Sequence, residues 1–209
     1  MTAKDLILIG AGGHARSCID VIQRAGEFTV VGIVGRPEEV GTRILGIEVI
    51  GTDGELDTFA QHFHHAFIGV GQVKTSRTRM KLYSDLKSKG FTIPLIISPE
   101  SYVSPYSKLG EGTIVMHGAI INAGVNIGDN CIINTRALIE HDSQIGDHCH
   151  ISTGAILNGK TMVGPGSFIG SGAILKEGIQ IGSKALVGMG IAVRKNLADH
   201  ESYLGQVQP

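Results

Sequence analysis

One histidine among the nine in the chain stands in a setting suited to proton transfer. His141 lies in the run IEHDS, directly between Glu140 and Asp142. An imidazole gains and loses its proton near neutral pH. A carboxylate beside it can fix the ring tautomer and raise its basicity. The pattern predicts a general base at His141, and the alternative is a solvated turn.

A second feature is the glycine turn in LILIGAGGHA. Gly10, Gly12, Gly13 and then His14 follow an apolar run and precede a helical segment. Glycines let a ligand approach the backbone, and a helix N-terminus offers free N–H groups to phosphate. The motif is a variant of the dinucleotide fingerprint, and Gly35 and Arg36, rather than an acidic residue, end the next strand. A whole NAD molecule is therefore not indicated, which leaves another phosphate-bearing ligand or a merely structural turn.

Secondary-structure elements must position both features. In the second half of the chain, the pattern of aliphatic residues repeats with a period of six. Every sixth residue from 103 to 193 is aliphatic, and the residue four places later is usually small. Glycines 110, 128, 146, 164 and 182 recur every eighteen residues, so three hexapeptides close one coil of a parallel β-helix. We expect these glycines to mark turns with an unusual backbone angle. Cys131 and Cys149, also eighteen apart, are expected to stack inside as small apolar residues.

The first half alternates strands with helices. Apolar runs at 6–9, 30–35, 66–71 and 92–98 predict strands, and residues 15–25 and 74–89 predict helices, the first ended by Gly26. Such alternation is typical of a small parallel sheet covered by helices. Prolines cluster around residue 98. The predicted organisation is a Rossmann-like domain at 1–98 and a β-helix domain at 99–209.

Composition narrows the functional class. The 209 residues are 42% hydrophobic and carry a net charge of −1, which gives no indication of a nucleic-acid partner. No apolar run reaches the ~20 residues of a membrane span, and we expect no membrane partner and no signal peptide at the N-terminus. Three cysteines are too few for a disulfide framework. We therefore expect a cytoplasmic protein.

The run from LGEGTI to ISTGAI resembles the left-handed β-helix of hexapeptide-repeat acyltransferases. That hand comes from the resemblance, since general rules favour right-handed connections. A short Rossmann-like domain with GAGGH ahead of the repeats is similar to the sialic acid O-acetyltransferases and the N-acetyltransferases of nucleotide-linked 4-amino-4,6-dideoxy sugars. The resemblance implies acetyl-CoA as cosubstrate and a role in surface-glycan biosynthesis. It places the nucleotide-sugar acceptor at Gly12, Gly13, His14, Gly35, Arg36 and Gly71.

The same resemblance assigns roles in the β-helix. It implies that His141 is the general base with Asp142 as its partner and Glu140 as the fallback, and that transfer is direct, without an acyl-enzyme. His150 corresponds to a residue that contacts the acetyl thioester, and His14 to a histidine near the acceptor. Family members form homotrimers with active sites between subunits. The acetyl-CoA site would comprise His150, Gly159, Gly170, Ser171, Gly188 and Met189, with Thr153 in the same column as Ser171 and Met189.

The chain departs from the family pattern at two places. Gly35 and Arg36 replace an acidic pair, and of the usual closing motif only Gly205 is in register. N-acetylation of a nucleotide-linked amino sugar is the leading hypothesis, and O-acetylation of sialic acid is the alternative. Two further alternatives are a γ-type carbonic anhydrase, with zinc held by His117, His141 and His148 or His150, and a β-helix that only binds. No metal is expected.

Overall fold

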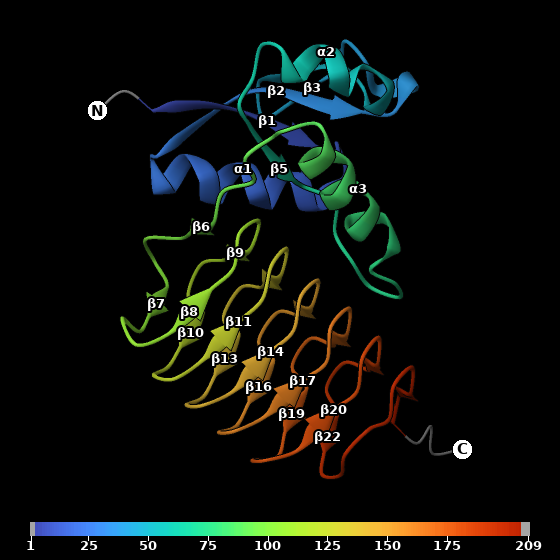
Figure 1. The fold of residues 1–209 in the computed structure, drawn as a ribbon. Helices are drawn as coiled ribbons and strands as arrows, with labels where there is room; N and C mark the ends of the chain where they lie inside the picture. The colour runs from blue at the N-terminus through green and yellow to red at the C-terminus, as the bar shows by residue number, and fades with distance from the viewer. Residues whose placement is uncertain (1–2, 206–209) are drawn as a thin grey trace. The chain divides into compact units, whose positions relative to one another are not determined.

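The computed structural model describes residues 3–205, and the chain divides into two compact units. The first holds the chain as far as Gly71 together with Arg77–Ser98, and the second holds Gln72–Ser76 and the chain from Pro99 onward. The first unit is an α/β domain and the second is a stack of coils (Figure 1). The short segment Gln72–Ser76 thus belongs to the coils although both of its flanks belong to the α/β unit.

The α/β unit is built on a five-stranded sheet. Its strands are β1 (Lys4–Ile9), β2 (Phe28–Gly35), β3 (Arg43–Ile44), β4 (Ile47–Thr52) and β5 (His65–Ile68). Their order in the sheet is β3-β4-β2-β1-β5, and all neighbours are parallel except the pair β3 and β4. The strands predicted at 6–9, 30–35 and 66–71 are present in this sheet. The strand predicted at 92–98 is not one of its five strands, since that stretch adds only an isolated bridge between Thr92 and His65, and the β3–β4 hairpin was not predicted. Its turn uses Leu45 (φ 49°) and Gly46 (φ 84°), the two left-handed residues that a tight hairpin needs.

Helices cover this sheet. The first, α1 (Gly13–Ala25), buries an apolar face and ends at Gly26 with φ 74°, as predicted. The others are α2 (Leu56–Ala60) and α3 (Arg77–Ser88), with the single 3-10 turns η1 (Pro37–Glu39) and η2 (Asp53–Glu55), and Ile96–Ile97 forms the short strand β6. The buried guanidinium of Arg79 fixes α3, because its Nη1 donates to the carbonyls of Ile68 (3.0 Å) and Val70 (2.7 Å).

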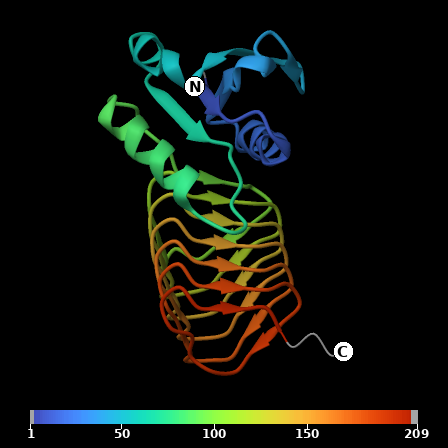
Figure 2. The same ribbon diagram turned by 90° about the vertical axis from the view of Figure 1, so that its right-hand side faces the viewer.

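The second unit is a left-handed parallel β-helix, as predicted. Its strands pair in register with residues eighteen positions away, for example Ile127 with Ile145. Figure 2 shows the coils stacked along one axis. The two-residue strands form three sheets: β7 (Tyr102–Val103), β10 (Ile120–Ile121), β13 (Leu138–Ile139), β16 (Ile156–Leu157), β19 (Ile174–Leu175) and β22 (Ala192–Val193); β8 (Lys108–Leu109), β11 (Asn126–Ile127), β14 (Gln144–Ile145), β17 (Met162–Val163) and β20 (Gln180–Ile181); and β9 (Ile114–Val115), β12 (Ile132–Ile133), β15 (His150–Ile151), β18 (Phe168–Ile169), β21 (Leu186–Val187) and β23 (Ser202–Tyr203).

The hexapeptide pattern fills the core of the coils. The aliphatic positions from Val115 to Val193 are at most 4% exposed, whereas Val103 and Leu109 in the first coil are half-buried. The column of small residues is buried as well. Cys131 and Cys149 belong to it, and their thiols donate to the carbonyls of the coil above, Gly146 and Gly164, each at 3.2 Å.

The eighteen-residue glycines are not where the left-handed turns lie, so that prediction was wrong. Every sixth residue from Gly112 to Gly190 has positive φ, whereas glycines 110, 128, 146, 164 and 182 do not. Those glycines are needed because coils approach closely there: a Cβ on Gly128 would lie 2.7 Å from the main-chain nitrogen of Asp147. Side-chain-bearing residues also adopt the left-handed turns, among them Asn130 (φ 52°) and Asp142 (φ 59°).

Within residues 3–205, no helix has the length and apolar character required to cross a bilayer.

Candidate functional site

His141 and Asp142 form a hydrogen-bonded pair on the surface of the β-helix. They lie in the turn between β13 and β14, and His141 Nδ1 is 3.0 Å from Asp142 Oδ2. About half of each side chain is exposed, 53% and 59%. A carboxylate only accepts, so the ring donates from Nδ1 and presents the lone pair of Nε2 outward. The pair therefore has the tautomer that a general base requires.

Glycines of the neighbouring coils make room for this pair. A Cβ on Gly159 would come within 2.6 Å of His141 Nε2, and one on Gly124 within 2.5 Å of an Asp142 carboxylate oxygen. Glu140, the fallback partner, is engaged elsewhere, since its Oε2 accepts from Asn122 Nδ2 at 2.9 Å. Gly159, expected at the acetyl-CoA site, thus lies against His141 instead.

The other five residues expected to contact acetyl-CoA line one pocket of about 680 Å³. It lies over β15, β18 and β21 and the turns that follow them. Its walls are largely apolar, and Met189 is 81% exposed there. Lys74 is its one lysine or arginine, and Thr153 is not among its lining residues. The sequence-predicted members are His150, Gly170, Ser171, Gly188 and Met189, joined by Val73, Lys74, Ser152, Phe168, Leu186, Val187, Ser202 and Leu204.

His150 is a buried wall of this pocket, with both ring nitrogens bonded. Nδ1 lies 2.6 Å from the carbonyl oxygen of Gln72, so it donates its proton there. Nε2 lies 3.0 Å from Asn134 Nδ2 and accepts. The ring stands edge-on to Phe168 at a centroid distance of 5.2 Å. These contacts define a neutral imidazole that holds the segment Gln72–Ser76 in place.

All six residues expected at the nucleotide-sugar site line one cleft of the α/β unit, with a volume of about 520 Å³. At its floor, α1 begins without a capping side chain and without an acidic residue in its first turn. A Cβ on Gly12 or Gly13 would meet nothing within 4 Å. The helix N-terminus is thus open to an anion. The six are Gly12, Gly13, His14, Gly35, Arg36 and Gly71.

Two acidic residues in this cleft were missed by the sequence analysis. Glu39 and Asp53 both line it, each in the 3-10 turn that follows a strand. Glu39 Oε2 accepts from the Arg36 main-chain nitrogen at 2.8 Å, and Oε1 accepts from Arg36 Nη2 at 2.8 Å. These bonds to Arg36 hold the pKa of Glu39 below its usual value. The run RPEEV carried the signal, because a glutamate three residues after the N-cap residue, here Arg36, can fold back to cap the turn.

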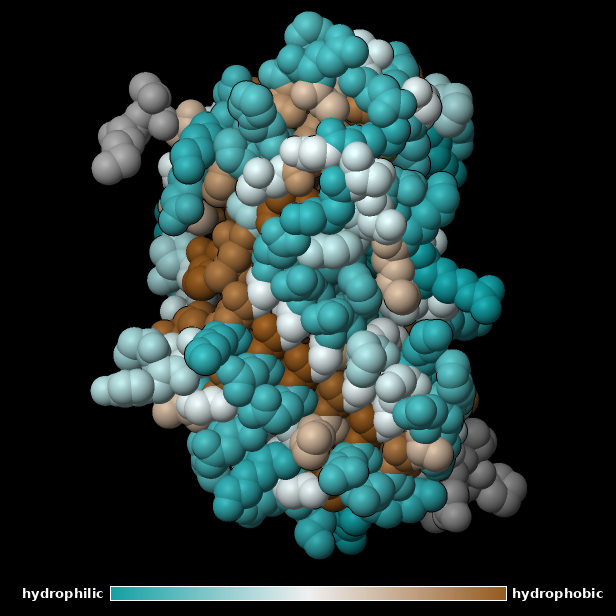
Figure 3. All heavy atoms as spheres, viewed as in Figure 1, coloured by the Kyte–Doolittle hydropathy of each residue, from teal (hydrophilic) through white to brown (hydrophobic). Residues whose placement is uncertain are grey.

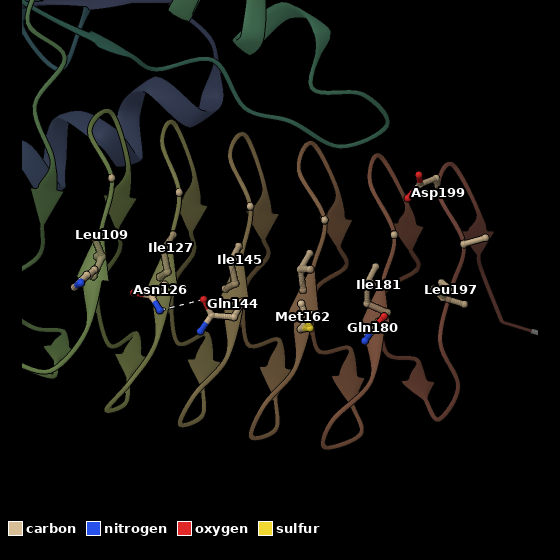
Figure 4. Close-up of a pocket in the computed structure, with 18 residues that line it drawn as sticks. Leu109, Asn126, Ile127, Gln144, Ile145, Met162, Gln180, Ile181, Leu197 and Asp199 are labelled. Atoms are coloured by element: carbon tan, nitrogen blue, oxygen red, sulfur yellow. Dashed lines mark hydrogen bonds between the residues drawn. The ribbon is translucent and has the colours of Figure 1, made fainter.

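A third cavity, of about 800 Å³, runs along the sheet of β8, β11, β14, β17 and β20. A line of hydrophobic residues follows this face in Figure 3. Figure 4 shows aliphatic side chains beside a row of exposed polar ones, with Asn126 Nδ2 donating to Gln144 Oε1 at 3.0 Å. None of the residues expected at a site lines this cavity.

The histidines considered as zinc ligands are dispersed. His148 Nδ1 lies 3.0 Å from Asn130 Nδ2, and His117 Nδ1 lies 3.8 Å from Glu100. Residues 3–205 contain no group of three or more His, Cys, Asp or Glu side chains placed to hold a metal ion.

Known families match both units. Residues 5–86 match the PglD N-terminal domain, residues 124–159 match the bacterial transferase hexapeptide (six repeats), and residues 109–135 and 160–195 match the hexapeptide repeat of succinyl-transferase. A comparison with curated proteins found no match.

Solved structures match nearly the whole chain. PerB from Caulobacter crescentus, in complex with CoA and GDP-perosamine, is 37% identical over 96% of this chain and 94% of its own, with a TM-score of 0.90. The chain belongs to the family of nucleotide-linked amino-sugar acetyltransferases. Two further structures of this perosamine N-acetyltransferase carry one histidine replaced by asparagine or alanine.

Other solved structures with this architecture are more distant. The acetyltransferase domain of PglB from Neisseria gonorrhoeae, in complex with acetyl coenzyme A, is 30% identical, with 97% of each chain covered and a TM-score of 0.88. WeeI from Acinetobacter baumannii, at 24% identity with 97% of each chain covered and a TM-score of 0.84, shares the fold. Family membership makes this protein a sugar acetyltransferase of the CoA-dependent hexapeptide-repeat class.

Proposed function

We propose that the protein is an acetyl-CoA-dependent N-acetyltransferase that acts on a nucleotide-linked 4-amino-4,6-dideoxy sugar in surface-glycan biosynthesis. The observation that carries this proposal is the His141–Asp142 hydrogen bond of 3.0 Å on the surface of the β-helix. The similarity to PerB, whose structure holds CoA and GDP-perosamine, supports the two substrates. We also propose that the reaction takes place in the cytoplasm.

In the proposed mechanism, the amine nitrogen of the sugar attacks the thioester carbonyl carbon of acetyl-CoA. His141 Nε2 takes the proton that the amine loses, while Asp142 steadies the imidazolium that forms. The tetrahedral intermediate collapses, the C–S bond breaks, and the CoA thiolate leaves and takes the proton from the His141 imidazolium, which returns the base to its neutral form. The products are the N-acetylated sugar and CoA, and no acyl-enzyme forms.

We assign the acetyl-CoA to the pocket over β15, β18 and β21. A Cβ on Gly170 would come within 2.6 Å of the Gly188 carbonyl oxygen, so the two coils that line the pocket stack closely there. Ser171 and Met189 form the adjoining wall, and the exposed Met189 thioether offers an apolar contact to the pantetheine arm. His150, whose ring nitrogens are both bonded, would shape the thioester end through its ring.

We assign the acceptor nucleotide to the α/β cleft. The diphosphate would sit at the start of α1, where Gly12 and Gly13 leave space and no acidic side chain repels it. His14, Gly35, Arg36 and Gly71 would surround the rest of the nucleotide sugar.

Within a single chain, the proposed base His141 and the acetyl-CoA pocket lie apart, and this separation favours the proposed homotrimer. His141 lies in the turn that follows β13, whereas Ser171 and Met189 lie in turns that precede β19 and β22. These turns stand at opposite ends of the strands of one sheet, β22-β19-β16-β13-β10-β7. In a ring of three copies, the His141 edge of one chain would complete the pocket edge of the next.

Thiol release from acetyl-CoA tests the proposal. The panel contains GDP-, UDP- and dTDP-linked 4-amino-4,6-dideoxy sugars, sialic acid and its CMP form. Turnover with an amino sugar, and an amide in the product by mass spectrometry, would support N-acetylation. Turnover only with the sialic acids would replace the proposal by O-acetylation.

A further inference from the structure

The cleft wall at the ends of β2 and β4 is made by Arg36 and Asp53. These strands are parallel neighbours, with Val34 paired to Gly51 and Gly35 to Thr52. Arg36 and Asp53 occupy the next position in that register, and both line the cleft. The cleft therefore presents a planar donor and a carboxylate acceptor side by side.

The guanidinium of Arg36 is held in a fixed orientation. Glu39 Oε1 accepts from Nη2 at 2.8 Å, and Glu38 Oε1 lies 3.1 Å from Nη1. The three side chains carry a combined charge of −1, one arginine against two glutamates. This cluster attracts phosphate poorly, whereas the start of α1 has no acidic residue in its first turn. Arg36 is thus better suited to an uncharged planar acceptor than to the diphosphate.

Asp53 complements it as an acceptor. Partial burial raises the pKa of this carboxyl above its usual value. The positive charge of Lys81 partly offsets this rise, and the negative charge of Asp85 adds to it. Within residues 3–205 no hydrogen bond is donated to the Asp53 carboxylate, so both oxygens are available to a ligand.

We propose that Arg36 and Asp53 read a guanine base on the acceptor nucleotide. Arg36 donates to O6 and N7, the pair of acceptors that arginine commonly recognises. Asp53 accepts from N1–H and the N2 amino group. Uracil and thymine have one N–H between two carbonyls, and adenine has an amino group in place of O6, so neither satisfies both side chains. This inference rests on the proposed function and specifies its acceptor as GDP-linked.

Calorimetric titration of the full chain with GDP, UDP, dTDP and ADP tests the inference. We expect GDP to bind most tightly. Arg36→Lys keeps the charge but loses the planar fork, and should weaken GDP binding about tenfold while leaving UDP binding within about twofold. Arg43→Ala is the matched control, because Arg43 forms an exposed ion pair with Glu48 at 3.0 Å and does not line the cleft.

A second variant changes the base that is preferred. Asp53→Asn replaces an acceptor by an amide that can donate, and xanthine carries a carbonyl where guanine carries the N2 amino group. We expect Asp53→Asn to lose about tenfold in GDP affinity and to bind xanthosine diphosphate more tightly than the wild type does. Thermal unfolding of each variant reports whether the fold is intact.

Three outcomes would overturn the inference. They are tighter binding of UDP or ADP than of GDP by the wild type, an equal loss for all four nucleotides in Arg36→Lys, and an unchanged base preference in Asp53→Asn. Acetylation of a UDP-linked amino sugar together with a UDP preference would leave the proposed function intact and refute guanine recognition alone.

Discussion

The imidazole of His141 rests against the backbone of Gly159 in the next coil, and a Cβ there would lie 2.6 Å from Nε2. Gly159 has ordinary φ, so the absence of a side chain serves the histidine and not the turn. The coil above therefore fixes where the lone pair of the proposed base points. Gly159 acts as a positioning residue although it does not line the donor pocket.

Gly159→Ala should move the imidazole while the coil remains folded. We expect kcat to fall about tenfold or more, because small displacements of a catalytic group are costly. The KM for acetyl-CoA should stay close to that of the wild type, since Gly159 does not line the donor pocket. Steady-state thiol release measures both quantities.

The control for this variant is Gly54→Ala, where the nearest neighbour of a Cβ would be Thr52 Oγ1 at 3.7 Å. Gly54→Ala should keep wild-type activity. Full activity in Gly159→Ala would show that the ring position seen here is not the working one.

A second prediction concerns the eighteen-residue glycines. Gly128→Ala should destabilise the protein by about 3 kcal/mol, the upper end of the usual cost of overpacking, because the new Cβ would meet the Asp147 backbone rather than a flexible side chain. Gly154→Ala, where nothing lies within 4 Å but φ is 65°, should cost only about 1–2 kcal/mol of left-handed backbone strain. Chemical denaturation should rank the two variants in this order. The reverse order would indicate that the backbone angle, and not the close approach of the coils, makes glycine necessary in these turns.

The three cysteines should be unreactive in the folded protein. Burial raises the pKa of the Cys18 thiol to about 12, partly offset by nearby Arg79. The hydrogen bond with Cys131 and burial raise that of Cys149 as well. A raised pKa removes the thiolate near pH 8, and burial excludes reagents from all three. A chromogenic disulfide reagent at pH 8 should detect no thiol before denaturant is added and three afterwards. Immediate reaction of any cysteine in the native protein would contradict this packing.

Complementation between chains tests the proposed trimer. His141→Ala keeps the pocket, and Ser171→Trp keeps the base but fills the pocket. Each variant alone should be inactive, and subunits exchanged between them should recover part of the activity. Native mass spectrometry would report the mixed trimers. Mixed trimers without activity would place base and donor on the same chain, and a stable monomer would remove the shared site.

The sequence determined the β-helix more completely than the α/β unit. Aliphatic residues at every sixth position specify the β-helix, because the inward-facing residues of successive coils must stack on one another. The β3–β4 hairpin escaped detection because its strands are short and its turn places Leu45, not a typical turn residue, at positive φ. The role of Gly128 was misassigned because sequence shows that a side chain is absent, but not whether the backbone angle or a neighbouring coil requires it.

The candidate site likewise contains residues that the sequence could predict and residues that it could not. His141 and Asp142 are adjacent in sequence, so their hydrogen bond could be anticipated. Asp53 reaches the cleft only through the pairing of β4 with β2, and that pairing cannot be read from local sequence. His150 was expected to face a ligand, yet Gln72 and Asn134 occupy its ring nitrogens.

Comparison of His141→Ala with the wild type tests the central claim most directly. With acetyl-CoA and a GDP-linked 4-amino-4,6-dideoxy sugar, we expect kcat to fall about 10²–10⁴-fold, as removal of a general base predicts. His148→Ala is the control, because His148 lies in a later turn and does not line the donor pocket. This variant should retain wild-type turnover. Undiminished turnover in His141→Ala would contradict the account and remove His141 as the base.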